Sequence, residues 1–185
     1  MGSLLDTESD INRRKSLAIT SANNLQHIFK NKNITKTTKI LALKTYIQPI
    51  FLYNCEVWTL TKVLNEKIDR FQRKLIRSYI LNVKWPDIFR NEEIYERVNI
   101  KRWSILCKKR RLKLLRKLSR MPEDVPAKIA MKYALEEYKR PRGRPNLTWI
   151  SLIKKDLNEL ALNWNEAINL ATDKPGWDRL INNFF

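Results

Sequence analysis

The chain has little glycine, cysteine and histidine, and each shortage excludes a class of protein. Its 185 residues include three glycines, two cysteines and one histidine. So few glycines favour long helices over tight turns and leave no glycine-rich loop that could cradle a phosphate. Cys55, Cys107 and His27 are too few for a structural zinc site, which needs four such ligands, and two cysteines indicate a reducing compartment without a disulfide framework. We therefore expect no metal ion or other cofactor.

The acidic pair that polymerase chemistry often uses is also missing. Two-metal nucleotidyl transfer needs carboxylates that converge on one site, and the sequence contains no Asp-Asp pair. Glu92-Glu93 stands where a helix is expected to begin, so its charge suits the positive end of the helix dipole. Glu136-Glu137 lies among basic residues, which is typical of a solvated pair. With no nucleophile elbow either, we expect no enzymatic activity from this chain on its own.

No apolar run is long enough to cross a bilayer. The most apolar stretch, 46–60, is short and is interrupted by Gln48, Asn54 and Glu56. No secretory signal opens the sequence. We expect an intracellular protein without a membrane span, and the basic runs at 108–111 and 139–145 are compatible with nuclear import.

Basic residues are abundant and concentrated. The chain has 37 Lys and Arg against 19 Asp and Glu, a net charge of +18. Residues 101–145 hold 16 basic and 4 acidic residues, and residues 101–120 hold ten basic residues and no acidic one. Like charges at helical spacing repel, so such a segment is unfavourable unless an anion lies nearby. The pattern predicts a polyanionic partner, nucleic acid first and an anionic membrane surface second.

Apolar residues recur at helical spacing along the whole chain, so we predict an all-α fold. Expected helices run from 10 to 30, from a Thr35 cap to 51 with a kink near Pro49, from a Thr61 cap to about 81, from 91 to 98, and from 101 to 121. A sixth helix is expected from 126 to 138, and a seventh from a cap at Asn146 or Thr148 to about 160. An eighth follows a capping box formed by Asn163 and Glu166, and a last one begins near Pro175. In the 101–121 helix we expect Trp103, Leu106, Cys107, Leu114 and Leu118 to form the apolar face, and we expect Trp149, Trp164 and Trp177 to pack in the core.

The segment Pro141-Arg-Gly-Arg-Pro145 matches the core of an AT-hook, which lies extended in the minor groove of A·T-rich DNA. Helices are expected directly before and after it, which is typical of a linker rather than of a free hook. Two readings stay open: a basic linker that contacts backbone phosphates, which we favour, and true insertion into the minor groove.

Several strings resemble the C-terminal part of LINE-type (non-LTR) retrotransposon reverse transcriptases. They are LYNCEVWTLTK (Leu52–Lys62), LIRSYILNVKWPDIFRNEEI (Leu75–Ile94), RRLKLLRKLSRMPED (Arg110–Asp124), RGRPNLTW (Arg142–Trp149) and LNWNEAINLATDKPGWDRLI (Leu162–Ile181). The five occur in the family's order and spacing and cover nearly the whole chain. Even GSLLDTESDI, at 2–11, resembles the strand that follows the palm motif in this family. Asn54 stands where the family usually has glycine, and Arg116-Lys117 stands where it often has Gly-His.

The resemblance implies a non-catalytic piece of an endonuclease–reverse transcriptase, because the endonuclease and the palm of the family precede the matched region. It implies a residual strand or leader at 1–9, a thumb-like helical bundle at 10–85, a basic helical region at 86–138, a basic linker at 139–147 and a small three-helix unit at 148–185. The thumb grips the template–primer duplex in this family, so the implied partners are RNA, an RNA–DNA hybrid or DNA. Whether a separate chain supplies a reverse-transcriptase palm as a further partner stays open.

The predicted nucleic-acid-binding residues are basic side chains of the third expected helix, the 101–121 helix and the linker. They are Lys67, Arg70, Arg73, Lys74, Arg77, Lys108, Lys109, Arg110, Arg111, Lys113, Arg116, Lys117, Arg120, Lys139, Arg140, Arg142 and Arg144. Two other classes of protein stay open: a transposon relic without a cellular task, and a basic amphipathic protein that binds membranes or calmodulin.

Overall fold

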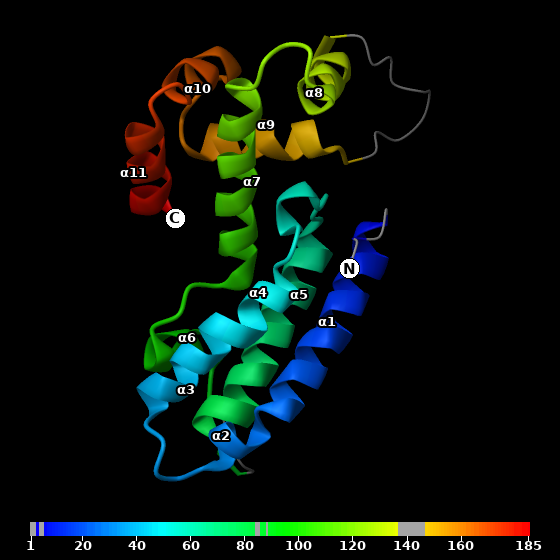
Figure 1. Cartoon of the computed structure of the whole chain (residues 1–185). Helices are drawn as coiled ribbons and strands as arrows, with labels where there is room; N and C mark the ends of the chain where they lie inside the picture. Colours follow the sequence, from blue (N-terminus) through cyan, green and yellow to red (C-terminus); the bar gives the residue numbers. More distant parts are fainter. Residues whose placement is uncertain (1–2, 4–5, 84–85, 88, 137–146) are drawn as a thin grey trace. The chain divides into compact units, whose positions relative to one another are not determined.

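The structure is a computed structural model of the whole chain and describes residues 3, 6–83, 86–87, 89–136 and 147–185. It is all-helical, as the sequence predicts, and the described residues contain no strand (Figure 1). None of the described helices is both long and apolar enough to cross a membrane.

The α-helices have the following bounds: α1 Thr7–Asn24, α2 Gln26–Lys30, α3 Lys36–Ala42, α4 Gln48–Phe51, α5 Lys62–Leu75, α6 Asn91–Val98, α7 Trp103–Ser119, α8 Pro126–Glu136, α9 Trp149–Glu159, α10 Trp164–Leu170 and α11 Lys174–Phe184. Two π-helical segments, Leu43–Ile47 and Ile76–Leu81, continue α3 and α5, and Cys55–Val57 forms one 3₁₀ turn.

Helix starts follow local signals in the sequence. The Thr35 side chain accepts a hydrogen bond from the backbone N–H of Thr38 and caps α3. Thr148 caps α9 in a reciprocal box with Ser151. Asn163 and Glu166 form the expected capping box at α10, with both hydrogen bonds at 2.9 Å. Each of these caps satisfies backbone N–H groups that the first turn leaves without a helical partner.

Near Pro49, where we expected a kink, the helix changes its winding. A proline has no N–H to donate to the carbonyl four residues earlier. The preceding segment Leu43–Ile47 widens to π-helical winding, and Pro49 then lies in the first turn of α4, where a missing N–H costs nothing.

The end of α9 is a Schellman turn. The N–H of Leu162 donates to the carbonyl of Leu157 at 3.0 Å, and the N–H of Ala161 donates to the carbonyl of Asn158 at 3.0 Å. Ala161 has a φ of 55°, the left-handed conformation that this turn requires and that glycine adopts more easily.

The chain divides into two compact units. Unit 1 comprises Met1–Asn54 and Lys62–Leu106, and unit 2 comprises Cys55–Thr61 and Cys107–Phe185, so α7 begins in unit 1 and continues into unit 2. In unit 1, α1 packs against α4 and α5 (Figure 1). Its centre is an aromatic cluster in which Phe51 stacks on Trp103 with ring centroids 4.8 Å apart and lies 5.1 Å from Phe71.

Two polar side chains of α5 fix the first turn of α7 in unit 1. Gln72 accepts a hydrogen bond from the Trp103 N–H at 2.8 Å and donates one to the Lys101 carbonyl at 3.0 Å. Asp69 accepts from the N–H and the hydroxyl of Ser104, at 3.0 and 2.7 Å. A carboxylate at this end of a helix also interacts favourably with the helix dipole.

Unit 2 has its own apolar core, formed by α7 to α11. Its buried members include Leu112, Leu115 and Leu118 of α7, with Ile153 of α9 and Trp177 of α11. One of our expectations for this core was wrong: Leu112 and Leu115 form the buried face of α7, and Leu114 is only partly buried. Trp177 is buried in the core as expected, and Trp149 and Trp164 pack against it as partly buried side chains.

A buried ion pair joins α7 to α9 in unit 2. Arg111 donates to one carboxylate oxygen of Asp156 through Nε at 2.8 Å and through Nη2 at 2.6 Å. Both side chains are at most 4% exposed. Lys108 lies 3.7 Å from the other carboxylate oxygen. Burial nevertheless raises the pKa of Asp156, with Arg111 acting in the opposite direction.

We predict that Asp156→Asn lowers the free energy of unfolding of unit 2 by about 3–5 kcal/mol, because it leaves the Arg111 charge buried without its counter-charge. The double variant Arg111→Met with Asp156→Leu should recover most of this loss, since apolar residues of similar size then replace both charges. Native-state hydrogen exchange of peptides from α9 and α11 measures unit 2 separately. A double variant as unstable as the single one would contradict the prediction.

Candidate nucleic-acid interface

Five side chains of α7, together with Arg120 directly after its last residue, occupy one continuous arc around the helix axis. At 3.6 residues per turn, Arg110, Lys113, Leu114, Arg116, Lys117 and Arg120 fall within roughly 160° of each other around the axis. At 1.5 Å per residue, the arc extends along about 15 Å of helix from Arg110 to Arg120. The opposite side carries the buried Leu112, Leu115 and Leu118, so packing of the core turns the arc outward.

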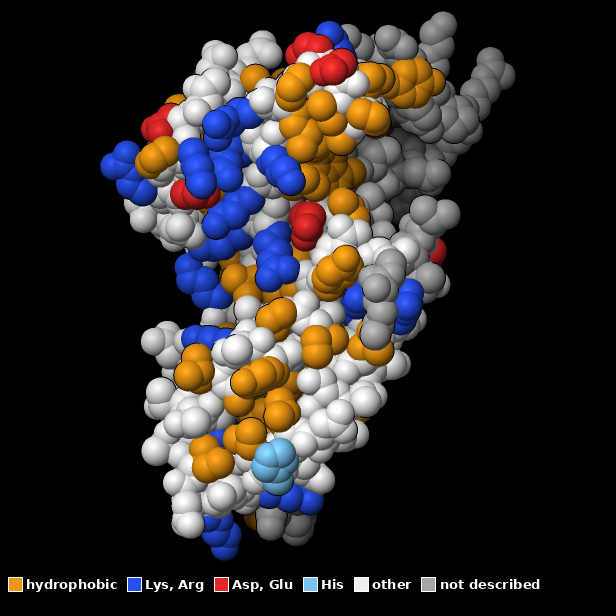
Figure 2. All heavy atoms as spheres, viewed as in Figure 1, with side chains coloured by type: hydrophobic (Ala, Val, Ile, Leu, Met, Phe, Trp, Pro, Cys, Tyr) orange, Lys and Arg blue, Asp and Glu red, His pale blue; other side chains and the backbone are white. Residues whose placement is uncertain are grey.

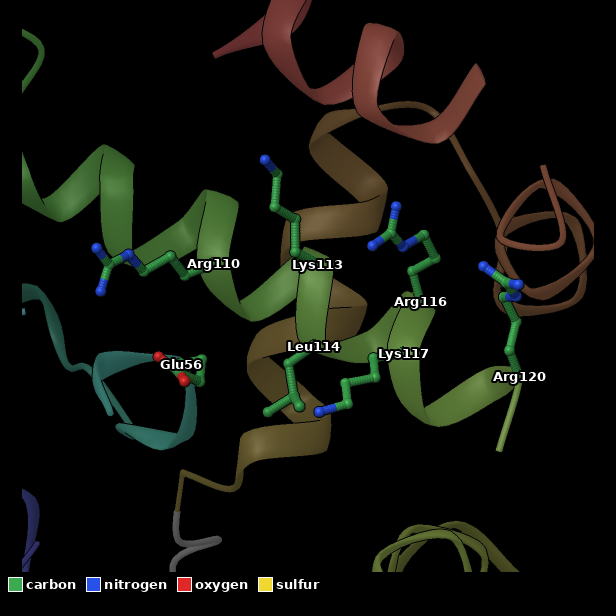
Figure 3. Close-up of a pocket in the computed structure, with 7 residues that line it drawn as sticks. All are labelled: Glu56, Arg110, Lys113, Leu114, Arg116, Lys117 and Arg120. Carbon is green, nitrogen blue, oxygen red and sulfur yellow. The ribbon is translucent and has the colours of Figure 1, made fainter. Parts of the chain in front are cut away.

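These six side chains and Glu56 line a groove of about 520 Å³ in unit 2. Figure 3 shows Lys113 and Arg116 on one side of α7 and Leu114 and Lys117 on the other, with Arg110 and Arg120 toward the two ends. Five of the seven lining residues are basic and one is acidic. In the space-filling view, Lys and Arg side chains gather on the face of unit 2 where α7 lies (Figure 2).

The basic side chains of this groove differ in how far they are neutralised. Asp178 of α11 accepts a hydrogen bond from Arg116 at 3.2 Å and lies 3.8 Å from the Lys113 ammonium. Lys117 and Arg120 are exposed and form no ion pair or hydrogen bond with the residues that the structure describes. The five basic side chains outnumber the two nearby carboxylates, Glu56 and Asp178, so the groove is positive and able to bind an anion such as a phosphate.

Three α7 residues expected on this surface lie elsewhere. Lys109 and Arg111 are 8% and 3% exposed, so they are buried in unit 2 and the prediction that they line the surface was wrong. Lys109 donates to the side chain of Asn182 at 3.2 Å, and Arg111 pairs with Asp156. Lys108 is mostly buried and pairs with Glu159 at 2.5 Å. Their partners lie 45 to 73 residues away in the sequence, beyond the reach of a helical pattern.

Of the five residues of unit 1 predicted to bind nucleic acid, some are also exposed and others are also paired or buried. Arg70 and Lys74 are exposed on α5, and the partly buried Lys67 pairs with Glu8 at 2.9 Å. Arg77 donates to the Asn91 side chain at 3.1 Å and to the Phe89 carbonyl at 3.4 Å. Arg73 is only 5% exposed, which corrects its placement on the binding surface.

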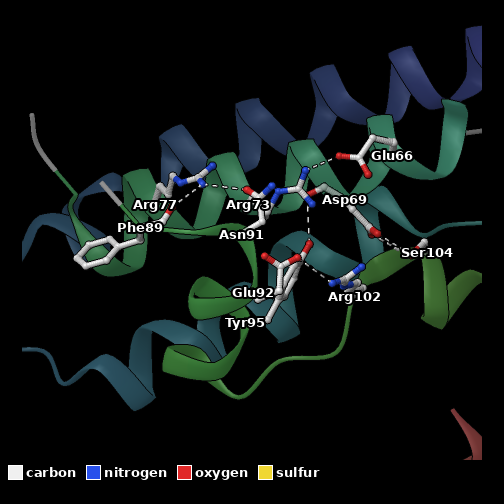
Figure 4. A network of polar contacts seen from close by, with 10 residues as sticks. All are labelled: Glu66, Asp69, Arg73, Arg77, Phe89, Asn91, Glu92, Tyr95, Arg102 and Ser104. Atoms are coloured by element: carbon white, nitrogen blue, oxygen red, sulfur yellow. Dashed lines mark hydrogen bonds and ion pairs between the residues drawn. The ribbon is translucent and has the colours of Figure 1, made fainter. Parts of the chain in front are cut away.

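Arg73 belongs to a polar network inside unit 1 (Figure 4). It donates to Glu66 at 2.6 Å and interacts with the hydroxyl of Tyr95, which in turn donates to the carbonyl of Asp69 at 3.3 Å. Burial, with a smaller contribution from Asp69, raises the pKa of Tyr95 to about 12. The hydrogen bond from Arg73 lowers the pKa of Glu66. The charge of Arg73 therefore has a structural role between α5 and α6.

The remaining predicted residues, Lys139, Arg140, Arg142 and Arg144, lie outside the described residues, as does the whole AT-hook-like segment 141–145.

A second basic groove, which our sequence analysis missed, lies on unit 1 between α1 and α5 and has a volume of about 610 Å³. Its lining includes Lys15 and Lys62, which were not among the predicted residues, together with Lys67, Arg70 and Lys74, which were. Lys15 could not be found from a local pattern because α1 has mixed charges. Only packing of α1 on α5 brings it to this surface.

Cys55 and Cys107 are both free and buried in unit 2. A hydrogen bond between the two thiols, together with burial, raises the pKa of Cys107 well above its usual value. The side chain of Arg110 lies 4.0 Å from the sulfur of Cys55. Because Cys107 keeps its proton, this pair behaves as a small apolar contact between the 55–57 turn and α7.

Among the described residues, no group of three or more His, Cys, Asp and Glu side chains is arranged to hold a metal ion. Comparison with known proteins adds no relative: the chain matches no protein-family model, no curated protein and no solved structure.

We predict that Glu66→Gln destabilises unit 1 at pH 7 by about 1 kcal/mol and has a smaller effect near pH 3. Since folding lowers the pKa of Glu66, its contribution is present above the unfolded pKa of about 4.3 and is lost as the pH falls through the folded pKa. Urea unfolding at both pH values, followed by hydrogen exchange in α5 and α6, measures the difference. Glu96→Gln is the matched control, because Glu96 is exposed on α6. An equal effect of Glu66→Gln at both pH values would refute the prediction.

Proposed function

We propose that this chain is a non-catalytic nucleic-acid-binding protein that holds RNA or an RNA–DNA hybrid through the phosphate backbone. The observation that carries the proposal is the α7 groove, where five basic side chains follow one another along about 15 Å of helix. Exposed Lys117 and Arg120 would contact phosphates first, and Arg110, Lys113 and Arg116 would extend the contact along the strand.

The proposed contact is electrostatic and independent of sequence. Lysine and arginine that neutralise phosphates release condensed counterions, which makes binding steeply dependent on salt. Among the residues that the structure describes, Leu114 is the only apolar one in the lining, and no aromatic side chain lies there. Base stacking in this groove therefore has no platform, which favours contacts to the backbone over contacts to bases.

As for origin, we propose that the chain corresponds to the thumb and tail of a LINE-type reverse transcriptase, with unit 1 in the place of the thumb. The five matching strings support this, and so does one backbone angle. Asn54, which replaces the family's usual glycine, has a φ of 58°. Glycine and asparagine are the residues that most readily adopt this left-handed conformation, so the replacement is compatible with a shared turn.

In this proposal, the described residues contribute grip on the nucleic acid rather than catalytic chemistry. Primer extension with added magnesium tests this: nucleotide incorporation by the purified chain alone would overturn it.

We predict that Lys117→Glu with Arg120→Glu weakens binding to RNA by tenfold or more at low salt, because two phosphate contacts are replaced by repulsion. The slope of log affinity against log salt should become shallower by roughly 1.5 for single-stranded RNA and roughly 2 for a duplex. Fluorescence anisotropy at 50 and 200 mM salt measures both quantities.

The matched control is Lys154→Glu with Lys155→Glu, which makes the same change of charge at two exposed positions of α9 in the same unit. Equal weakening by both double variants would mean that only net charge matters, and the α7 groove would lose its role. Four ligands of equal length complete the test: single-stranded RNA, hybrid, A·T-rich duplex and G·C-rich duplex. Affinity for RNA or hybrid equal to or above that for duplex supports the proposal.

A preference for the A·T-rich duplex that disappears in Arg142→Ala with Arg144→Ala would overturn it in favour of minor-groove binding by the hook segment. Failure to bind any of the four ligands would leave the α7 groove without this function.

A further inference from the structure

The groove between α1 and α5 on unit 1 differs in chemistry from the α7 groove. Its lining combines two apolar side chains, Val63 and Phe71, with the basic side chains of Lys15, Lys62, Lys67, Arg70 and Lys74. We refer to the apolar pair as the floor of this groove and to the basic side chains as its rim. Val63 is 75% exposed, more than any other large hydrophobic residue that the structure describes. Phe71 is 4% exposed, so Val63 is the more accessible of the two apolar contacts in this groove.

The cations of the rim are only partly matched by carboxylates. Lys67 pairs with Glu8. Lys15 lies over the ring of Phe71, 5.8 Å from its centroid. Lys62, Arg70 and Lys74 are exposed on α5, and within the described part of the chain they make no ion pair. The groove therefore offers a positive rim around an apolar floor.

The spacing of these residues suits a helical ligand. Val63, Lys67, Arg70 and Lys74 follow one another at steps of three and four residues, so they form one stripe along α5. α1 forms the opposite wall and contributes Lys15. A groove between two helices, with apolar contacts at its base and charges along its edges, is the receptor side of helix-in-groove recognition. Its volume of about 610 Å³ lies within the range of about 300–1,000 Å³ typical of ligand sites.

One feature disfavours a nucleic-acid backbone here. A phosphate strand would leave Val63, which lies in the lining, against charged, hydrated groups. An acidic amphipathic helix avoids this, because its apolar face covers Val63 and Phe71 while its carboxylates reach the lysines and arginine of the rim.

We propose that this groove docks an acidic amphipathic helix of a partner protein. Apolar side chains at i, i+3, i+4 and i+7 of that helix would contact Val63 and Phe71, and flanking carboxylates would pair with Lys62, Arg70 and Lys74. The surface is separate from the α7 groove, so the two sites can be tested independently.

The probe is a fluorescein-labelled peptide of about 18 residues with Leu at i, i+3, i+4 and i+7 spacing and Glu and Ala elsewhere. Its control has the same composition in an order that scatters the Leu residues around the helix. Anisotropy with the full chain should show the amphipathic peptide binding at least tenfold more tightly than the scattered one. Equal binding would mean attraction by charge alone and would overturn the proposal.

We predict that Val63→Asp weakens binding of the peptide at least tenfold, because it places a carboxylate on the apolar floor. The helical circular dichroism signal should be unchanged, since the side chain is exposed in the free protein. Leu41→Asp is the matched control: Leu41 is 61% exposed on α3 of the same unit. Similar weakening by both variants would overturn the assignment of the site.

Two further measurements separate this proposal from the nucleic-acid proposal. Lys117→Glu with Arg120→Glu should leave peptide binding unchanged, and Lys62→Glu with Lys74→Glu should abolish it while retaining most RNA affinity. If RNA instead displaces the peptide from the wild type and Lys62→Glu with Lys74→Glu loses RNA affinity, the groove belongs to nucleic acid and the docking proposal fails.

Discussion

The ion pair between Arg111 and Asp156 is the interaction on which the architecture of unit 2 depends. The segment 101–120 contains ten basic residues and no acidic one, yet one side of α7 must enter an apolar core. A buried guanidinium is tolerated only when a counter-charge and hydrogen bonds accompany it. Asp156 provides both from α9, and Lys108 lies close enough to share it. Leu112 and Leu115 beside the pair can then pack, and the remaining cations of α7 face outward.

The same division between buried and exposed cations occurs in unit 1. Arg73 enters the fold by pairing with Glu66 and Tyr95, whereas Arg70 and Lys74, three residues before and one residue after it, stay on the surface. The positive charge of the chain is therefore not spread evenly over its surface. In each unit, some cations join helices and others are exposed. The exposed cations surround two grooves that differ in their lining: Leu114 is the apolar residue of the α7 groove, whereas Val63 and Phe71 both line the groove between α1 and α5.

The helices could be predicted from the sequence because their caps and apolar spacing are local features. The exposed basic residues could be predicted only in part, because ion pairs and hydrogen bonds with residues far along the chain decide which of them are buried. The caps at Thr35, Thr148 and Asn163 act within three residues, and the helix expected at 101–121 is found as α7, Trp103–Ser119. Which cations are exposed depends on partners far along the chain: Asn182 for Lys109, Asp156 for Arg111 and Asp178 for Arg116. Leu114 was placed in the core because its spacing from Cys107 and Leu118 is helical. Leu112 and Leu115 also lie at helical spacing from Leu118, and they are the residues buried in the core. Spacing alone therefore does not distinguish Leu114 from Leu112 and Leu115 as the buried residues of α7.

Ala161 offers a means of studying the charged surfaces without losing the fold. An alanine in the left-handed conformation costs roughly 1 kcal/mol relative to glycine, and its side chain is exposed at the end of α9. Ala161→Gly would relieve this strain while leaving the Schellman hydrogen bonds, the core and every charge as they are. It is therefore a suitable background in which to accumulate charge reversals on α7, since the added stability offsets what each reversal removes.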